Sequence, residues 1–176
     1  DVDLSSEPGL HIPYLAAELY GDENVVENLQ LDWTFDPYVK GAQRGFVGHL
    51  YDTGKIENVC LFDIEIHGYS ETGGLVGYSQ GTVNDSFAVG KVEGFNNLAG
   101  GLIGENEGLV NRSHADVDVI SCMMLGGLVG ENDGHIEQSF ASGEVRVYDI
   151  QTSKKTVGGL VGLNRFTGDI KDAYAV

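Results

Sequence analysis

Hydrophobic and polar residues alternate along short stretches of this chain. The stretch HADVDVIS (114–121) places two valines on one side of an extended backbone and two aspartates on the other, and SGEVRVYD (142–149) alternates in the same way. A period of two predicts β-strands with one buried face. No stretch has the period of an amphipathic helix, so the pattern predicts an all-β protein.

The predicted strands recur within a repeat. A glycine pair, two aliphatic residues and a third glycine appear in TGGLVG, AGGLIG, LGGLVG and VGGLVG. Each copy continues with a polar turn, a β-branched residue, a Ser-aromatic-Ala triplet or a relative of it, and an alternating tail. The second glycines of the pairs are Gly74, Gly101, Gly127 and Gly159, and a less regular copy begins at Gly45.

Units of this size hold about three short strands, which close a core only when the units stack on one another. The repeat therefore predicts a single-stranded parallel β-helix, with each strand about 4.8 Å from its equivalents in neighbouring coils. The glycines are expected at sharp turns, where they tolerate positive φ. Stacking would also align the polar turn residues into a ladder that comprises Ser79, Asn106, Asn132 and Asn164.

The repeats divide the chain into two parts. Residues 45–176 hold the repeats, which start near 45, 74, 101, 127 and 159, and residues 1–44 are expected to form lead-in or capping coils. An aromatic loop at 32–44 contains Trp33, and it either binds a partner or folds back onto the solenoid. In the first repeat the tail CLFDIEI is out of phase, because Asp63 and Glu65 take the outward parity, and this predicts a β-bulge.

Charge narrows the range of partners. The 176 residues include 27 acidic and 10 basic side chains, a net charge of -17, which disfavours nucleic acid and anionic lipid surfaces. No apolar run approaches the ~20 residues of a membrane span, so no membrane insertion is expected. The acidity is either a solvated coat or a site for divalent cations. Cys60 and Cys122 match neither a disulfide framework nor a metal motif.

The sequence gives no catalytic constellation. The five histidines form no His-x-x-x-His pair, and no phosphate-binding loop occurs. The segment GYSQG (77–81) has the spacing Gly-x-Ser-x-Gly, but it lies in a repeat without a helical period, whereas a nucleophile elbow joins a strand to a helix. The prediction is therefore no enzyme, no cofactor and no resident metal. One alternative for Ca²⁺ remains, because oxygen ligands from several acidic residues on one outward face would suit it. These residues are Glu93, Asp116, Asp118 and Glu144.

One column of the repeat is a candidate binding surface. By the parity of the tails, its rings point outward while the adjacent serine and alanine point inward. An outward ring column either forms a platform for sugars or covers the sheet by ring stacking. The column consists of Phe87, His114, Phe140 and Tyr174.

The repeats resemble a known motif. The segments GGLVGYSQGTVNDSFAVGKV, GGLIGENEGLVNRSHADVDV and GGLVGENDGHIEQSFASGEV are similar to the GLUG motif. That repeat occurs in large secreted and surface bacterial proteins, including IgA-specific metallopeptidases and filamentous-haemagglutinin-like adhesins. The resemblance implies a secreted or cell-surface location. It implies no catalysis, because the zinc motif of those peptidases lies in a different domain.

These observations together favour a non-enzymatic repeat module that serves as an adhesin shaft, spacer or interaction surface. Its expected partner is an extracellular protein or a glycan surface. Two alternatives remain: a carbohydrate-binding or carbohydrate-active β-helix, and a self-assembling extracellular fibre subunit. The last coil, which ends at DAYAV, lacks an alternating tail. It is expected either to belong to a longer array or to pair head-to-tail with a second copy.

Overall fold

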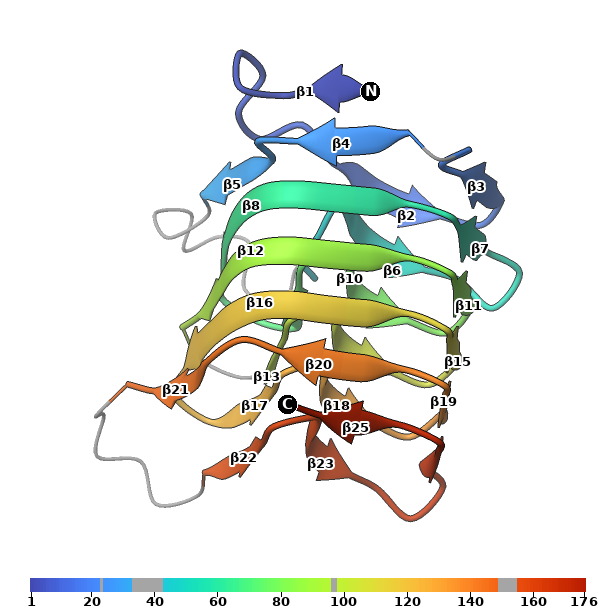
Figure 1. Ribbon diagram of the computed structural model, residues 1–176, viewed down its shortest axis with the longest axis vertical. Coiled ribbons are helices and arrows are strands. Elements are labelled where there is room, and N and C mark those ends of the chain that lie inside the picture. The colour runs from blue at the N-terminus through green and yellow to red at the C-terminus, as the bar shows by residue number, and fades with distance from the viewer. Residues whose placement is uncertain (23, 33–42, 96–97, 149–154) are drawn as a thin grey trace.

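The regular elements of this protein are parallel β-strands that stack from coil to coil. The structure is a computed structural model, and it describes residues 1–22, 24–32, 43–95, 98–148 and 155–176. Figure 1 shows the strands of successive coils lying one below another from the N-terminal to the C-terminal end. The predicted parallel β-helix is confirmed.

The strands form four sheets, which we call A to D. Sheet A contains β1 (Val2–Asp3), β4 (Val25–Glu27), β5 (Gln30–Asp32), β8 (Cys60–Gly68), β12 (Phe87–Gly94), β16 (His114–Ser121), β20 (Phe140–Ser142), β21 (Val145–Val147) and β25 (Tyr174–Ala175). Sheet B contains β2 (Ile12–Leu15), β6 (Val47–Leu50), β10 (Val76–Ser79), β14 (Ile103–Asn106), β18 (Val129–Asn132) and β23 (Val161–Asn164).

The other two sheets have shorter strands. Sheet C contains β3 (Glu18–Tyr20), β7 (Lys55–Glu57), β11 (Thr82–Asn84), β15 (Leu109–Asn111), β19 (His135–Glu137) and β24 (Asp169–Lys171). Sheet D contains β9 (Thr72–Gly73), β13 (Leu98–Gly100), β17 (Met124–Gly126) and β22 (Thr156–Gly158). A complete coil therefore runs D, B, C, A. The estimate of about three strands per coil did not include sheet D.

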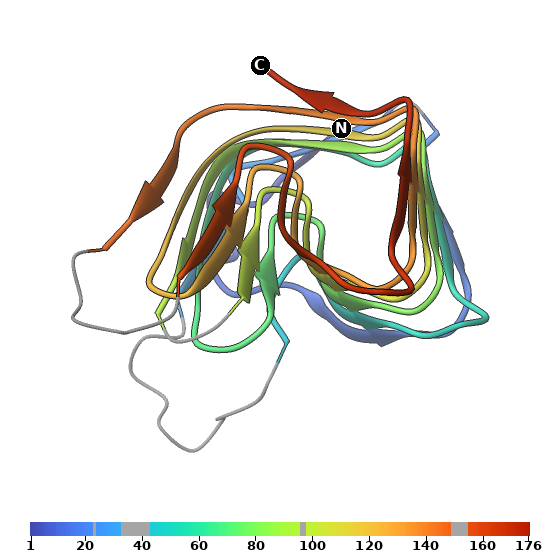
Figure 2. The ribbon, with the colours of Figure 1, turned by 90° about the horizontal axis from the view of Figure 1, so that it is seen from below.

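Sheets D and B form a bend that enters the cross-section of the solenoid, as Figure 2 shows in the view along the coils. The two backbones come into direct contact there. A Cβ atom added to Gly100 in sheet D would overlap the carbonyl oxygen of Ile103 and lie 2.7 Å from the amide nitrogen of Gly130 in sheet B. Only glycine permits this approach, because real Cβ atoms do not come so close to backbone atoms.

The second glycine of each pair lies at the tip of the bend, beneath sheet A. A Cβ atom on Gly101 would overlap the carbonyl oxygen of Gly127 and lie 2.9 Å from the Cβ atom of Ala115. The same atom on Gly127 would lie 3.0 Å from the Cβ atom of Ala141. The small residue of the Ser-aromatic-Ala triplet therefore leaves room for the glycine corner of the same coil.

The expectation that the repeat glycines use positive φ is wrong. In the described residues the positive-φ glycines are Gly9, Gly90 and Gly143, none of them part of a Gly-Gly pair. The left-handed corner lies instead between sheets C and A and is made by residues with side chains, at φ values of 46 to 55°. This corner column comprises Asn58, Asp85, Arg112, Gln138 and Asp172.

The core is one continuous cluster of stacked aliphatic columns. In sheet C, for example, Val83 pairs in register with Val110, which pairs with Ile136. The predicted bulge in the first repeat is also present, because Ala88 pairs with Leu61 while Gly90 pairs with Ile64. Strand β8 therefore carries one residue more than β12 at this point.

The N-terminal residues continue the same coils. Strands β2, β3 and β4 pair with β6, β7 and β8 of the first repeat, and β1 pairs with β4. The predicted aromatic loop at 32–44 falls mainly on residues 33–42, which lie outside the described residues. Among the described residues, no helix is long and apolar enough to cross a membrane.

The tight corner gives a stability prediction with a matched control. We expect Gly101→Ala to lower the free energy of unfolding by about 3 kcal/mol, because the new methyl group overlaps backbone that belongs to another coil. At the same repeat position, a Cβ atom on Gly159 meets only the Cβ atom of Ala175, at 3.0 Å. Gly159→Ala should therefore cost about 1 kcal/mol or less. Urea unfolding measures both, and equal losses would contradict the proposed role of the corner.

Candidate functional site

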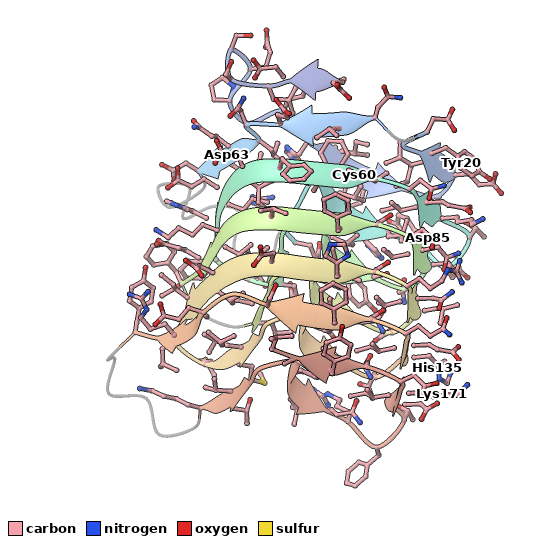
Figure 3. The ribbon with its side chains drawn as sticks, in the orientation of Figure 1. Tyr20, Cys60, Asp63, Asp85, His135 and Lys171 are labelled. Carbon is pink, nitrogen blue, oxygen red and sulfur yellow. The ribbon has the colours of Figure 1, made fainter. Side chains whose placement is uncertain are left out.

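The predicted aromatic column exists on the outer face of sheet A. Phe87 pairs in register with His114, His114 with Phe140, and Phe140 with Tyr174. Their ring centroids are separated by 4.7, 4.6 and 5.4 Å, with interplanar angles of 15, 5 and 10°. Cys60 continues the column toward the N-terminus, and Figure 3 shows it on β8 above the rings.

A buried serine column holds the rings in place. The Ser113 hydroxyl donates to the carbonyl oxygen of Asn111 and accepts the amide N–H of Ser86 in the neighbouring coil, at 3.2 Å. The amide N–H of Ser113 in turn donates to the hydroxyl of Ser139. Because serine and alanine on either side of the ring face inward, alternation directs each ring outward.

The stacking affects what the column can bind. A pyranose packs on the face of an aromatic ring, but each internal ring here has a neighbouring ring on both faces. His114, for example, lies between Phe87 and Phe140. This geometry favours the reading in which the rings cover the sheet and support one another. A sugar platform on these four residues stays a prediction.

Burial changes the chemistry of the one titratable ring inside the stack. The pKa of His114 is lowered from its usual value, chiefly by desolvation, while the nearby Asp116 carboxylate acts in the opposite direction. The neutral imidazole is therefore favoured between the two phenyl rings.

A second aromatic cluster lies on the outer side of sheet B and was not foreseen from the sequence. His49 stacks on Tyr51 with centroids 4.1 Å apart, and it lies 4.7 Å from the ring of Tyr78 and 6.4 Å from that of Tyr14. Burial raises the pKa of Tyr78, as does a hydrogen bond to Glu107. Tyr14, His49 and Tyr78 share one register position, but Tyr14 lies before the recognisable repeats.

The predicted polar ladder is built from hydrogen bonds between coils. The side-chain amide of Asn106 donates to the Oδ1 atom of Asn132, and that of Asn132 donates to the Oδ1 atom of Asn164, each at 2.8 Å. Asn106 also accepts the amide N–H of Gly108, so the ladder closes the turn between sheets B and C. Ser79 shares the register, but its buried hydroxyl has no partner among the described residues.

The acidic residues considered for Ca²⁺ are mostly used in pairings within the sheet. Asp118 accepts the amide N–H of Glu144 at 2.9 Å, and Asp116 accepts the hydroxyl of Ser142 at 3.0 Å. The Glu93 carboxylate is paired with Lys91. In the described part of the chain, no group of three or more His, Cys, Asp or Glu side chains is placed to hold a metal ion.

Two other sequence predictions concern single residues. Trp33 lies outside the described residues, so its place on the solenoid is not part of the site. Cys60 and Cys122 are not joined by a disulfide.

A protein-family model matches one segment of the chain. The matching segment begins at the end of β16 and contains β17, β18, β19, β20 and β21, which is one full coil through sheets D, B, C and A. Residues 121–147 match the GLUG motif. The family match therefore describes one turn of the solenoid, and its neighbours in register are consistent with a GLUG-motif repeat region. The comparison with curated proteins gave no match, and neither did the comparison with solved structures.

The buried imidazole gives a pH prediction. Since the folded-state pKa of His114 is below its unfolded value, the neutral ring contributes its full stability above about pH 6.5, and this contribution is lost as the pH falls through the folded pKa. His114→Phe keeps the stack and removes the titration. We expect the unfolding free energy of this variant, relative to wild type, to rise between about pH 7.5 and about pH 5. Urea titrations measure it, and a constant difference across this range would contradict the prediction.

Proposed function

We propose that this chain is a non-enzymatic repeat module of a secreted or cell-surface bacterial protein and that it acts as a shaft, a spacer or an interaction surface. The observation that carries the proposal is the in-register stacking of the coils. Leu75, Leu102 and Leu128 each donate a backbone N–H, at 2.9 Å, to the equivalent leucine of the following coil. Each added coil extends such a rod by about 4.8 Å without changing its cross-section.

Side chains on the outer faces also tie coils together. Arg112 forms a two-point ion pair with Asp85, at 2.7 and 2.6 Å. Lys171 is paired with Glu137 at 2.7 Å, and Arg165 with the buried carboxylate of Glu131. Figure 3 shows Asp85, His135 and Lys171 along one edge of the solenoid. Such contacts support a stiff element, because bending the rod would break many of them together.

The GLUG match supports the bacterial surface setting. In the proteins that the repeat resembles, it belongs to large extracellular chains. The net charge of -17 suits an exposed and well-hydrated module. The outward residues differ from coil to coil while the corners and core recur. Variation of this kind is expected if the outer faces, rather than the core, contact partners.

The location is tested on the bacterium that encodes the chain. Antibodies raised against the folded module should label intact cells or the culture medium, and an antibody against a cytoplasmic protein should label only permeabilised cells. Incubation of the module with soluble polysaccharides should release no reducing ends. Labelling that requires permeabilisation would contradict the surface location, and release of reducing ends would contradict the non-enzymatic role.

A further inference from the structure

The bulge in β8 changes which side chains reach the outer face of sheet A. Regular alternation would place one of two consecutive residues outside, but both Phe62 and Asp63 are exposed opposite the single residue Val89. Asp63 adopts a φ of 53°, and Gly90, in the next coil, a φ of 143°. A Cβ atom on Gly90 would overlap the carbonyl oxygen of Ile64, so the partner strand needs a glycine at this point.

Phe62, Asp63, Val89 and Gly90 line part of a depression of about 470 Å³ on the outer face. Val25, Phe62 and Val89 form its apolar walls. The Phe62 ring is held perpendicular to Phe87, with centroids 5.2 Å apart, and 39% of the residue remains exposed. Phe62 thus presents a fixed aromatic surface beside the stacked column without being part of the stack.

Two carboxylates complete the depression. Glu27 pairs in register with Phe62, and Asp63 follows Phe62 along the bulge. Neither carboxylate has a hydrogen-bond or ion-pair partner among the described residues. The neighbouring Asp3 differs, because it accepts the side-chain amide of Asn28 at 2.8 Å and the amide N–H of Ser5 at 2.9 Å. Asp63 is the fourth residue of β8, and Figure 3 shows it on the side of Cys60 toward β5.

Most basic side chains in the described part of the chain are already paired with carboxylates. The salt bridges of the described part of the chain already hold Lys55, Lys91, Arg112, Arg146, Arg165 and Lys171. Because the protein has a net charge of -17, it would repel an anionic ligand from the depression. A cationic group is favoured by the unpaired carboxylates and by the field of the whole molecule.

We propose that this depression binds a lysine or arginine side chain from a basic, extended segment of a partner protein. The apolar walls suit the methylene stem of such a side chain, and the carboxylates of Glu27 and Asp63 suit its charged head. The ring of Phe62 adds a cation–π contact. Asp116, which pairs in register with Val89 one coil further on and also accepts the hydroxyl of Ser142, offers a carboxylate for a second basic residue. This specifies the interaction surface of the proposed function.

The test uses the whole chain and a dye-labelled acetylated hexalysine amide at low salt. Fluorescence anisotropy should show binding that weakens with added salt. Amide chemical shifts should change most at the lining residues, which are Val25, Glu27, Asn28, Phe62, Asp63, Val89 and Gly90. We expect Phe62→Ala and Asp63→Asn each to weaken binding by about 3- to 10-fold. Phe166→Ala and Asp52→Asn are matched controls, because both residues are exposed and lie outside the depression. Thermal unfolding followed by circular dichroism checks that each variant is folded.

Other outcomes would overturn the proposal. If the control substitutions weaken hexalysine binding equally, the peptide binds the acidic surface non-specifically and the depression is not its site. Binding of maltohexaose to the depression, without binding of hexalysine, would identify a neutral sugar site, and no binding of either would remove the site altogether. The binding test and the location test can fail separately. The depression can bind the peptide even if antibodies fail to label intact cells, and antibodies can label intact cells even if the depression binds no peptide.

Discussion

The backbone contact between sheets D and B is the constraint on which the coil depends. Sheet D runs toward the interior, the chain reverses at a glycine pair, and sheet B returns against it with no side chain between them. Any Cβ atom at Gly100 would overlap this contact, so the repeated glycines reflect the distance between two backbones rather than unusual dihedral angles. The alanines of sheet A follow from the same contact, because the corner of the bend lies directly beneath them.

Once the coil closes in this way, stacking determines the other columns. Each residue lies about 4.8 Å from the residue at the same position of the neighbouring coil. A residue type therefore stabilises the stack where two copies of it interact favourably. Asparagine does so through its amide, serine through its hydroxyl, and aromatic rings through offset stacking. Like charges repel one another, and at two such positions the solenoid places Arg112 beside Asp85 and Lys171 beside Glu137. The outward face is thus mostly committed to contacts between coils, and the unpaired carboxylates at the bulge are an exception.

The sequence predicted much of the fold, and each feature that it did not predict has a physical reason. The repeat and the alternation predicted stacked parallel strands and outward rings, and the parity of Asp63 predicted the bulge. Sheet D was missed because strands as short as Thr72–Gly73 show no alternation. The role of the repeat glycines was misassigned because sequence does not distinguish a need for positive φ from a need for space. The left-handed corner was missed since Arg112 and Gln138 are not residues that favour it. The pocket at the bulge required the register between β8 and β12, which no repeat alignment supplies.

The most direct test of the account is the detection of scalar couplings across hydrogen bonds by NMR in the isotopically labelled chain. The solenoid predicts couplings from the amide nitrogen of Leu75 to the carbonyl carbon of Leu102, from Leu102 to Leu128, and from Leu128 to Leu160. Each connects the same position of two successive coils, as only parallel in-register stacking does. Couplings between adjacent segments within one repeat, in the reciprocal pattern of antiparallel hairpins, would contradict the account.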